Sequence, residues 1–267
     1  MSSAYREIDE KTWKRALHCQ IFRNSANPQY CVTFELDITN FLAKVKAKKL
    51  SFTMAFIYAV SNCANEIEEF RYRFVDGKVV LFDRIHTAFT YLNPDTELFK
   101  VVNVEMQDTL EEYVAVATQT AVNQKEYFTG PLANDVFQFS PFPWVSYTHI
   151  SHTDSGKKDQ ATPLFDWGKF FERDGKTMLP FSVQVHHSFV DGIHIGKRRL
   201  CLKIAQVGIV VEWLRLLVNF GKSCGDFFNL FGKLLQLLSH HLAQNFVPHN
   251  FTKKLYLFAQ FSFFVAL

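Results

Sequence analysis

The sequence predicts an α/β or α+β fold with a mixed β-sheet. Segments that alternate apolar and polar residues, as half-buried strands do, recur over the first two hundred residues. Amphipathic helical segments lie between them, and Val75-Asp76-Gly77-Lys78 has the composition of a hairpin turn. Helices interspersed with hairpin-connected strands favour one sheet that contains both strand orientations.

The predicted elements follow from this periodicity. Gln29–Ile38 alternates as a strand, and Thr39-Asn40 can cap the helix that follows it. The helix expected after Leu50 carries Phe52, Ala55 and Phe56 on one face. In full, we expect strands at residues 29–38, 71–74, 79–82, 88–92, 97–104, 145–150 and 178–187, and helices at 41–49, 51–69 and 110–124.

The composition is that of an ordinary globular protein. Hydrophobic residues make up 48% of the 267 positions and charged residues 21%, enough for a sizeable core. A net charge of +3 gives no indication of nucleic-acid binding. The five cysteines form no CxxC pair, which is typical of a reducing cytoplasm, and the first ten residues contain no apolar run of a signal peptide. We therefore expect a cytoplasmic protein.

Composition and charge change at about Gly196. Residues 197–267 carry nine Lys/Arg and two acids, a net charge of +7, which leaves −4 on residues 1–196. The second part is dominated by Leu, Phe and Val, with helical spacing over 197–217 and an amphipathic, aromatic stretch at 227–242. We expect a domain over residues 1–196 and an atypical basic, apolar extension over 197–267.

The motif with the most chemical content ends the strand expected at 178–187. His186 and His187 are followed by Asp191-Gly192, where the chain must turn. Histidine is suited to accept a proton near neutral pH, and a nearby carboxylate can orient its ring. By itself the pattern is also compatible with a polar strand end followed by a turn.

Other chemistry is less well supported by the sequence. Adjacent histidines on a strand point to opposite faces, and no Cys/His/carboxylate cluster has metal-ligand spacing, so we expect no metal site. No glycine-rich phosphate loop is present. Five further histidines carry no recognisable site: His18, His86, His149 and the adjacent pair His240-His241 in the extension.

The HHxxxDG pattern and several upstream segments resemble the chloramphenicol acetyltransferase family over residues 8–196. The order and spacing of many segments match, and other HHxxxDG families lack the N-terminal set. The matching segments are Trp13-Lys14-Arg15, Leu36-Asp37-Ile38-Thr39, Glu69-Phe70-Arg71, Asp76-Gly77, Thr96-Glu97-Leu98-Phe99, Ser140-Pro141-Phe142-Pro143-Trp144-Val145 and Leu179–His187.

The resemblance implies an acetyl-CoA-dependent O-acetyltransferase that acetylates the primary hydroxyl of chloramphenicol and confers antibiotic resistance. Acetyl-CoA would be a co-substrate, with no permanently bound cofactor. His187 would be the general base, and Ser140 would donate a hydrogen bond to the oxyanion. Asp191 would pair with Arg15 as a buried structural carboxylate. The implied fold is a two-layer α/β sandwich, assembled as a homotrimer with active sites between subunits.

The same resemblance assigns residues around the substrates. Phe22, Tyr30, Thr90 and Phe99 would line the acceptor pocket, with core packing as the alternative for each position. Lys169 would lie near a phosphate of CoA.

Three positions depart from the family pattern. Asp166 replaces a threonine, and a carboxylate beside a developing oxyanion would oppose it. Gln160 replaces an aromatic residue of the acceptor pocket, and Ser51 stands where a cofactor-contacting lysine is common. Two alternatives therefore stay open: an acetyltransferase for another small hydroxylated acceptor, or an inactive or repurposed member whose extension binds a membrane or a partner. The extension itself is either an acquired segment or the product of a shifted reading frame.

Overall fold

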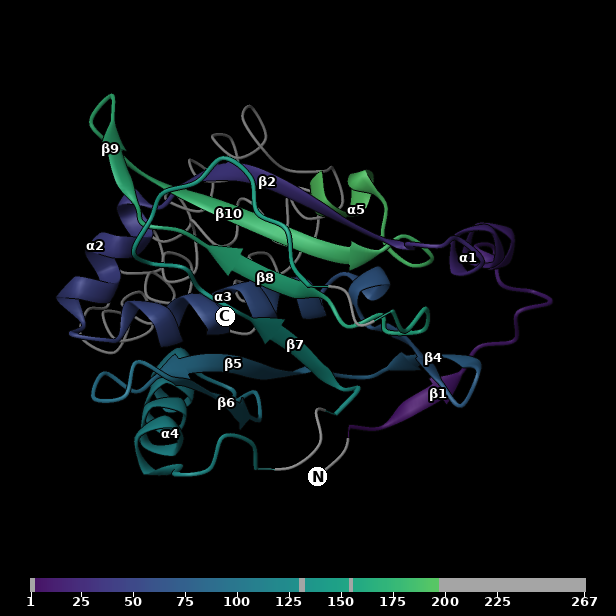
Figure 1. The fold of residues 1–267 in the computed structure, drawn as a ribbon, viewed down its shortest axis with the longest axis horizontal. Coiled ribbons are helices and arrows are strands. Elements are labelled where there is room, and N and C mark those ends of the chain that lie inside the picture. Colours follow the sequence, from purple (N-terminus) through teal and green to yellow (C-terminus); the bar gives the residue numbers. More distant parts are fainter. Residues whose placement is uncertain (1–2, 130–132, 154–155, 197–267) are drawn as a thin grey trace, which may run out of the picture. The chain divides into compact units, whose positions relative to one another are not determined.

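The computed structural model describes residues 3–129, 133–153 and 156–196 (Figure 1). The domain boundary expected at residue 196, the helix expected at 197–217, the stretch at 227–242 and His240-His241 concern residues outside this set. Those expectations stay predictions.

The centre of the fold is a seven-stranded mixed sheet. Its strands run in the order β2-β10-β8-β7-β5-β6, and β9 pairs with the far end of β10. The β5–β7 and β7–β8 pairs are parallel, and the others are antiparallel. The strands are β2 (Gln29–Asp37), β5 (His86–Leu92), β6 (Phe99–Val104), β7 (Val136–Phe139), β8 (Leu164–Trp167), β9 (Phe171–Arg173) and β10 (Lys176–His186).

A smaller antiparallel sheet has the order β1-β4-β3, with strands β1 (Tyr5–Glu7), β3 (Tyr72–Val75) and β4 (Lys78–Phe82). The predicted turn joins β3 to β4. Asp76 and Gly77 both adopt positive φ, 49° and 79°, as the two central residues of a tight hairpin do. The hairpin prediction is confirmed.

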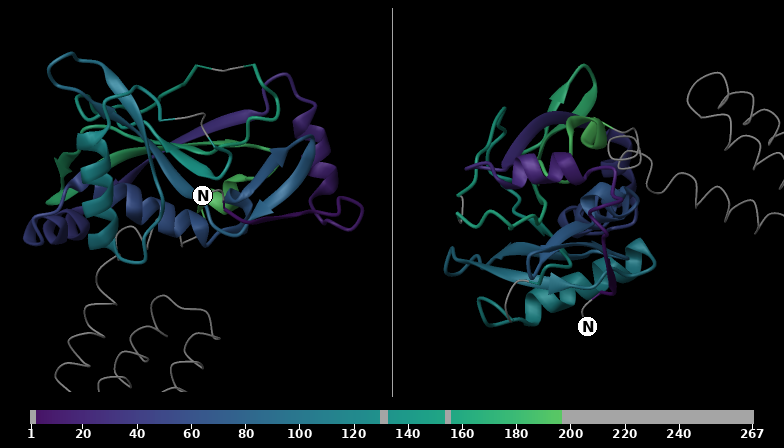
Figure 2. Two further views of the ribbon diagram at one scale, coloured as in Figure 1. Left: turned by 90° about the horizontal axis from the view of Figure 1, so that it is seen from below. Right: turned by 90° about the vertical axis from the view of Figure 1, so that its right-hand side faces the viewer.

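The helices are α1 (Ala16–Arg23), α2 (Thr39–Ala47), α3 (Phe52–Asn65), α4 (Leu110–Asn123) and the short α5 (Gly192–Gly196). Helices α2, α3 and α4 lie on one face of the larger sheet, whereas α1 lies beyond the end of β10, next to the turn that follows it (Figure 1). Helix α3 lies against the sheet centre, where the Phe56 ring is 5.0 Å from Trp167 of β8 and 5.7 Å from Phe181 of β10. The two layers and the mixed sheet confirm the predicted α/β sandwich (Figure 2).

The opposite face of the same strands is polar at its centre. In the β10–β8 pair Ser182 lies opposite Asp166, and both are fully buried. Successive strand residues point to opposite faces, so these two project away from the α3 side that Phe181 faces. The segment between β7 and β8 lies on this side, opposite α3 (Figure 2). The sheet therefore separates an aromatic core from a polar layer.

Several element boundaries differ from the sequence predictions. The strand expected at 145–150 is wrong, since this segment is irregular and Val145 is exposed. Pro141 and Pro143 just before it cannot donate to a strand ladder. Helix α2 begins at Thr39 and not at Phe41, with Ile38 at the N-cap position. The helix expected at 51–69 is α3, which ends at Asn65, and a 3-10 turn at Glu68–Phe70 follows.

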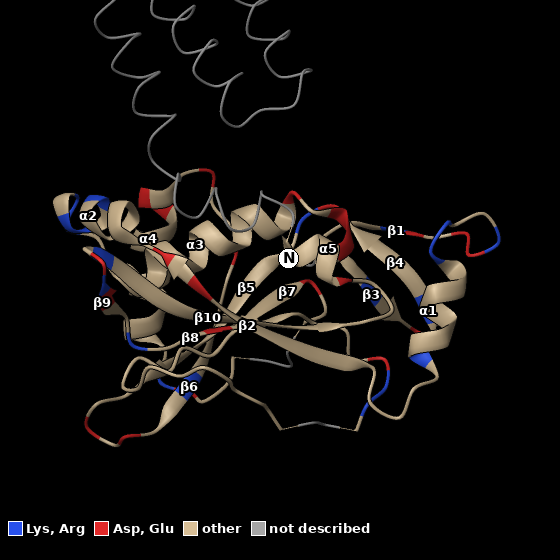
Figure 3. Ribbon diagram, turned by 90° about the horizontal axis from the view of Figure 1, so that it is seen from above, with Lys and Arg blue, Asp and Glu red and all other residues tan. Residues whose placement is uncertain are grey.

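Most charged residues lie on helices and connecting segments, and the strands of the larger sheet carry few (Figure 3). Among the helices of the described residues, none is long and apolar enough to cross a membrane.

Candidate active site

The turn after β10 is fixed by one arginine from the start of the chain. Arg15 donates two hydrogen bonds to the Asp191 carboxylate, 2.6 Å to Oδ2 and 2.7 Å to Oδ1. The same guanidinium donates to the carbonyl of Ser188 at 2.7 Å and to that of His187 at 3.0 Å. Arg15 immediately precedes α1, so this contact anchors the N-terminal segment to the HHxxxDG turn. Its bidentate geometry is the strong form of a guanidinium–carboxylate pair.

The His187 ring is held between aromatic side chains. It stacks on Phe22 of α1 with a centroid distance of 3.8 Å and an angle of 14°, and the Tyr30 ring lies 4.7 Å away. The Tyr30 hydroxyl donates to the carbonyl of Val190 at 3.2 Å. The His187 side chain remains 35% exposed. These contacts fix the imidazole plane and leave one edge of the ring accessible.

Asp191 does not orient that ring through an aligned hydrogen bond. His187 Nδ1 is 3.1 Å from Asp191 Oδ1, within ion-pair distance, yet Nδ1 has no hydrogen-bond partner of acceptable geometry among the described residues. A hydrogen bond requires an aligned donor as well as a short distance, and this contact has only the short distance. Both carboxylate oxygens are already committed to Arg15.

The Arg15 hydrogen bonds hold the pKa of Asp191 below its usual range. The Asp191 side chain is 31% exposed, because the turn places it at the protein surface. The expectation of a buried carboxylate is therefore wrong, since Asp191 is only partly buried. Burial raises the pKa of Tyr30 to about 12, which keeps its hydroxyl protonated.

The first histidine of the pair is structural. His186 is buried, with Nε2 2.8 Å from the carbonyl of Lys158 and Nδ1 accepting from the Ser188 amide at 3.1 Å. Its ring packs edge-on to Phe74. Burial lowers the pKa of His186, so it stays neutral at pH 7. The two histidines therefore face different surroundings, as strand alternation predicts.

Ser140 lies in a separate pocket on the polar face of the sheet. This pocket has a volume of about 360 Å³ and, among its described lining residues, His187 does not occur. The Ser140 amide bonds to the Phe165 carbonyl at 3.1 Å, which continues the β7–β8 pairing. Nine of the lining side chains are polar: Gln29, Thr90, Gln138, Ser140, His152, Thr153, Gln160, Thr162 and Gln184.

The predicted site residues thus fall into two groups. His187, Asp191, Arg15, Phe22 and Tyr30 come together at the turn after β10. Thr90 and Ser140 line the pocket, together with Gln160.

Two predicted residues lie in neither group. Phe99 begins the outermost strand β6, is 47% exposed and contacts Tyr127. Lys169 is exposed after β8, and its amide donates to the Val145 carbonyl at 3.0 Å.

One functional candidate was missed by the sequence reasoning. His152 lines the Ser140 pocket, and its Nε2 is 2.7 Å from Oδ2 of the fully buried Asp166. The two residues are 14 positions apart, one in an irregular segment and one in β8, so no periodicity links them. The Asp166 charge is thereby engaged by an imidazole.

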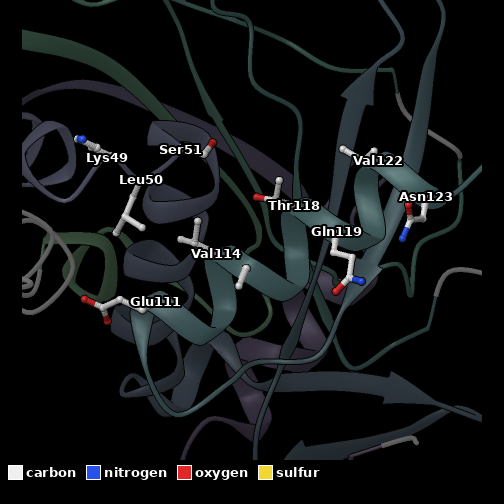
Figure 4. A pocket seen from close by; sticks show the side chains of 10 residues that line it. Lys49, Leu50, Ser51, Glu111, Val114, Thr118, Gln119, Val122 and Asn123 are labelled. Atoms are coloured by element: carbon white, nitrogen blue, oxygen red, sulfur yellow. The ribbon is translucent and has the colours of Figure 1, made fainter.

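A larger hollow, of about 600 Å³, lies between the α2–α3 connection and α4 (Figure 4). Lys49, Leu50 and Ser51 form one side, and α4 residues such as Thr118 and Gln119 form the other. It is wide open and contains none of the motif residues, so we do not place the chemistry there. Within the described ranges, no three His, Cys, Asp or Glu side chains converge as a metal site would require.

Comparison with solved structures defines the class of fold. A chloramphenicol acetyltransferase structure superposes with a TM-score of 0.67 at 26% identity, covering 76% of this chain and 99% of that one. Dihydrolipoamide acetyltransferase from Azotobacter vinelandii superposes with a TM-score of 0.53 at 18% identity, over 72% of this chain and 87% of that one, a likeness of fold alone. The molecule therefore has the CoA-dependent acyltransferase fold.

The family model "Chloramphenicol acetyltransferase" matches residues 3–202. The chloramphenicol acetyltransferase of Escherichia coli is 31% identical over 198 residues, 73% of this chain and 90% of its own length. That of Clostridium perfringens is 29% identical over 196 residues, 71% of this chain and 89% of its own length. The chain belongs to the chloramphenicol acetyltransferase family, as its motifs predicted.

Proposed function

We propose that this protein transfers the acetyl group of acetyl-CoA to the primary hydroxyl of chloramphenicol. The observation that carries the proposal is the His187 imidazole, stacked on Phe22 and backed by the Arg15–Asp191 pair. A general base must present an accessible nitrogen in a fixed orientation, and this ring is both oriented and partly exposed.

In the proposed reaction, His187 Nε2 accepts the proton of the acceptor hydroxyl while that oxygen attacks the thioester carbonyl carbon. A tetrahedral intermediate forms, with negative charge on the former carbonyl oxygen. Ser140 Oγ donates a hydrogen bond to that oxyanion, an interaction typically worth about 2.7–4 kcal/mol. Collapse breaks the C–S bond, and the proton held by His187 goes to the leaving CoA sulfur. No acyl-enzyme is formed.

The described residues do not place His187 and Ser140 in one pocket of a single subunit, which bears on where the reaction takes place. The pocket that contains Ser140 and Thr90 has no His187 among its described lining residues. We propose that His187 of one chain faces this pocket in a neighbouring chain, within a homotrimer. Sedimentation equilibrium tests the assembly, and mixing inactive His187→Ala and Ser140→Ala subunits tests the shared site. Restored activity in mixed trimers supports it, and its absence contradicts it.

Thiol release from acetyl-CoA, measured with and without chloramphenicol, tests the activity itself. We expect chloramphenicol-dependent release, reduced by about 10²–10⁴-fold in His187→Ala. His186→Ala is the matched control at the neighbouring position, although its burial makes a folding check necessary. Equal activity of His187→Ala and the parent protein would remove the general base assignment.

In a cell, we propose a cytoplasmic enzyme that confers resistance to chloramphenicol. Expression in a sensitive bacterium should raise the inhibitory concentration of chloramphenicol, and the His187→Ala gene should not. An unchanged inhibitory concentration with abundant folded enzyme would contradict the resistance role.

We further propose that the acyltransferase domain ends near Gly196 and that residues 197–267 are appended to it. Replacing 197–267 by one amphipathic helix of about twenty residues, as the resemblance implies, tests the shifted-frame hypothesis. If the full-length protein is inactive, recovery of activity in the replacement supports that hypothesis, and no recovery contradicts it. An active full-length protein favours an acquired segment.

A second candidate is acetylation of a different small hydroxylated acceptor. The observation that favours it is the polar lining of the Ser140 pocket, which includes Gln160 where the family pattern has an aromatic residue. A non-catalytic, repurposed member remains the alternative from another class, and the thiol-release assay separates it from both enzymes.

A further inference from the structure

A second histidine–carboxylate pair lies in the Ser140 pocket. His152 Nε2 is 2.7 Å from Asp166 Oδ2, the Asp166 side chain is fully buried, and that of His152 is 17% exposed. The other oxygen of Asp166, Oδ1, has no hydrogen-bond partner among the described residues. His152 is therefore the group that offsets the burial of this carboxylate, and breaking the contact would be costly.

The pair fixes the orientation of the imidazole and its tautomer. The hydrogen bond that Nε2 donates to Asp166 raises the pKa of His152, and burial raises the pKa of Asp166. With Nε2 directed to the carboxylate, Nδ1 is the nitrogen left to contact a ligand. Nδ1 donates when the ring is protonated and accepts when it is neutral, so a hydroxyl can satisfy it in either state.

The rest of the pocket is built to offer hydrogen bonds. Gln184 Nε2 donates to Gln29 Oε1 at 2.6 Å, and Gln29 Nε2 donates to the carbonyl of Gln160 at 2.7 Å. This chain of amides joins β10 and β2 to the 157–162 segment, so the polar side of the pocket is ordered before any ligand arrives. Ser140 and His152 line the same space.

We infer that His152, positioned by Asp166, is a specificity-determining residue that selects acceptors bearing a hydroxyl group at this end of the pocket. The inference deepens the proposed function, on which it rests for the identity of the reaction. A flat apolar ring would leave Nδ1 of the imidazole without a partner, whereas a hydroxylated ring would satisfy it. Buried polar groups discriminate strongly against ligands that cannot pair with them.

Two acceptors that differ only in one group give the test: chloramphenicol and its analogue with a hydroxyl in place of the nitro group. Calorimetry on the full-length protein measures both dissociation constants, and thiol release measures both kcat/KM values. We expect the parent protein to favour the hydroxyphenyl analogue by about tenfold or more, and His152→Leu to remove or reverse that preference. The side-chain amide of His152→Gln can still form a hydrogen bond with the acceptor, so this variant should keep part of the preference for the hydroxyphenyl analogue.

Asp166→Asn tests the positioning role separately from folding. It keeps a polar group and removes the charge, so the NMR titration midpoint of the His152 ring should fall relative to the parent protein. The double variant His152→Leu/Asp166→Asn avoids a stranded carboxylate and replaces His152→Leu if the latter does not fold.

The outcomes distinguish the two claims. An unchanged preference in a folded His152→Leu or double variant, with His187-dependent acetylation intact, overturns the inference and leaves the proposed function standing. A changed binding preference without any acetylation by the parent protein supports the specificity role and contradicts the proposed function. An unmoved His152 midpoint in Asp166→Asn overturns the positioning role.

Discussion

Replacing Arg15 by Met removes the guanidinium that ties the HHxxxDG turn to the start of the chain. Four hydrogen bonds of 2.6–3.0 Å are lost, two to the Asp191 carboxylate and two to the carbonyls of Ser188 and His187. Met fills a similar volume along the side-chain stem, so the change is mainly one of charge and hydrogen bonding.

The loss in free energy of unfolding lies between two limits. Breaking a fully buried ion pair costs about 3–5 kcal/mol, whereas an exposed pair contributes about 0–1 kcal/mol. The Arg15 and Asp191 side chains are 14% and 31% exposed. We therefore expect the free energy of unfolding to fall by about 2–3 kcal/mol, after discounting the buried value for solvent screening.

The pH dependence follows from the lowered pKa of Asp191. A carboxyl whose folded pKa is depressed contributes stability above its unfolded pKa, about 3.9, and loses it as pH falls through the folded pKa. The difference in stability between the parent protein and Arg15→Met should thus be constant above about pH 5 and narrow below about pH 4.

Urea unfolding at fixed protein concentration, followed by tryptophan fluorescence, measures both effects. Asp191→Asn and the Arg15→Met/Asp191→Asn double variant complete a mutant cycle, in which we expect a coupling of about 1–2 kcal/mol. The kcat should also fall, by about 10²-fold, because the His187 carbonyl loses its anchor. A change below about 0.5 kcal/mol, or no coupling in the cycle, would refute the anchoring role.

Three further predictions concern the oxyanion donor, the sheet and the core. Ser140→Ala should lower kcat by about 10²–10³-fold with little change in acetyl-CoA affinity, and steady-state kinetics that instead show only a raised KM would contradict the oxyanion role. Gly168→Ala should lower the free energy of unfolding by about 1–3 kcal/mol, because the new Cβ would lie 2.7 Å from the Val145 carbonyl oxygen. A thermal melt measures this loss, and an unchanged melting temperature would show that the segment at Val145 moves freely. Phe56→Ala should lower the free energy of unfolding in urea by about 3–5 kcal/mol, since the ring is fully buried against Trp167 and Phe181. A loss below about 1 kcal/mol would mean that neighbouring side chains fill the space that the ring leaves.

Elements with strong local periodicity were predicted well. The strand that runs into the histidines, the hairpin at Asp76-Gly77 and the helix α4 depend on alternation, turn chemistry and a Thr109 capping box, all of which are local. Strands β7 and β8 were not predicted, because each has four residues, most of them buried. A short buried strand has no polar face to produce an alternating pattern.

For the site, the motif and the family resemblance pointed to His187, Asp191, Arg15 and Ser140, whereas His152 carried no local signal. The motif places His187 and Asp191 four residues apart, and the family resemblance adds Arg15, which is 176 residues from Asp191. That His187 is not among the described lining residues of the Ser140 pocket depends on the tertiary arrangement of the strands, which no local pattern encodes.

The amino-acid sequence by itself determined the family, the general base candidate and the unusual character of residues 197–267, because motifs, spacing and composition are properties of the linear chain. The tertiary structure decided which side chains meet. It gave the Arg15–Asp191 pair that the resemblance implied its bidentate geometry, buried His186 against the carbonyl of Lys158, and brought His152 from an irregular segment to Asp166 on β8. These pairings form because a carboxylate or an imidazole loses water inside the fold, and a partner from a distant segment replaces the lost hydrogen bonds.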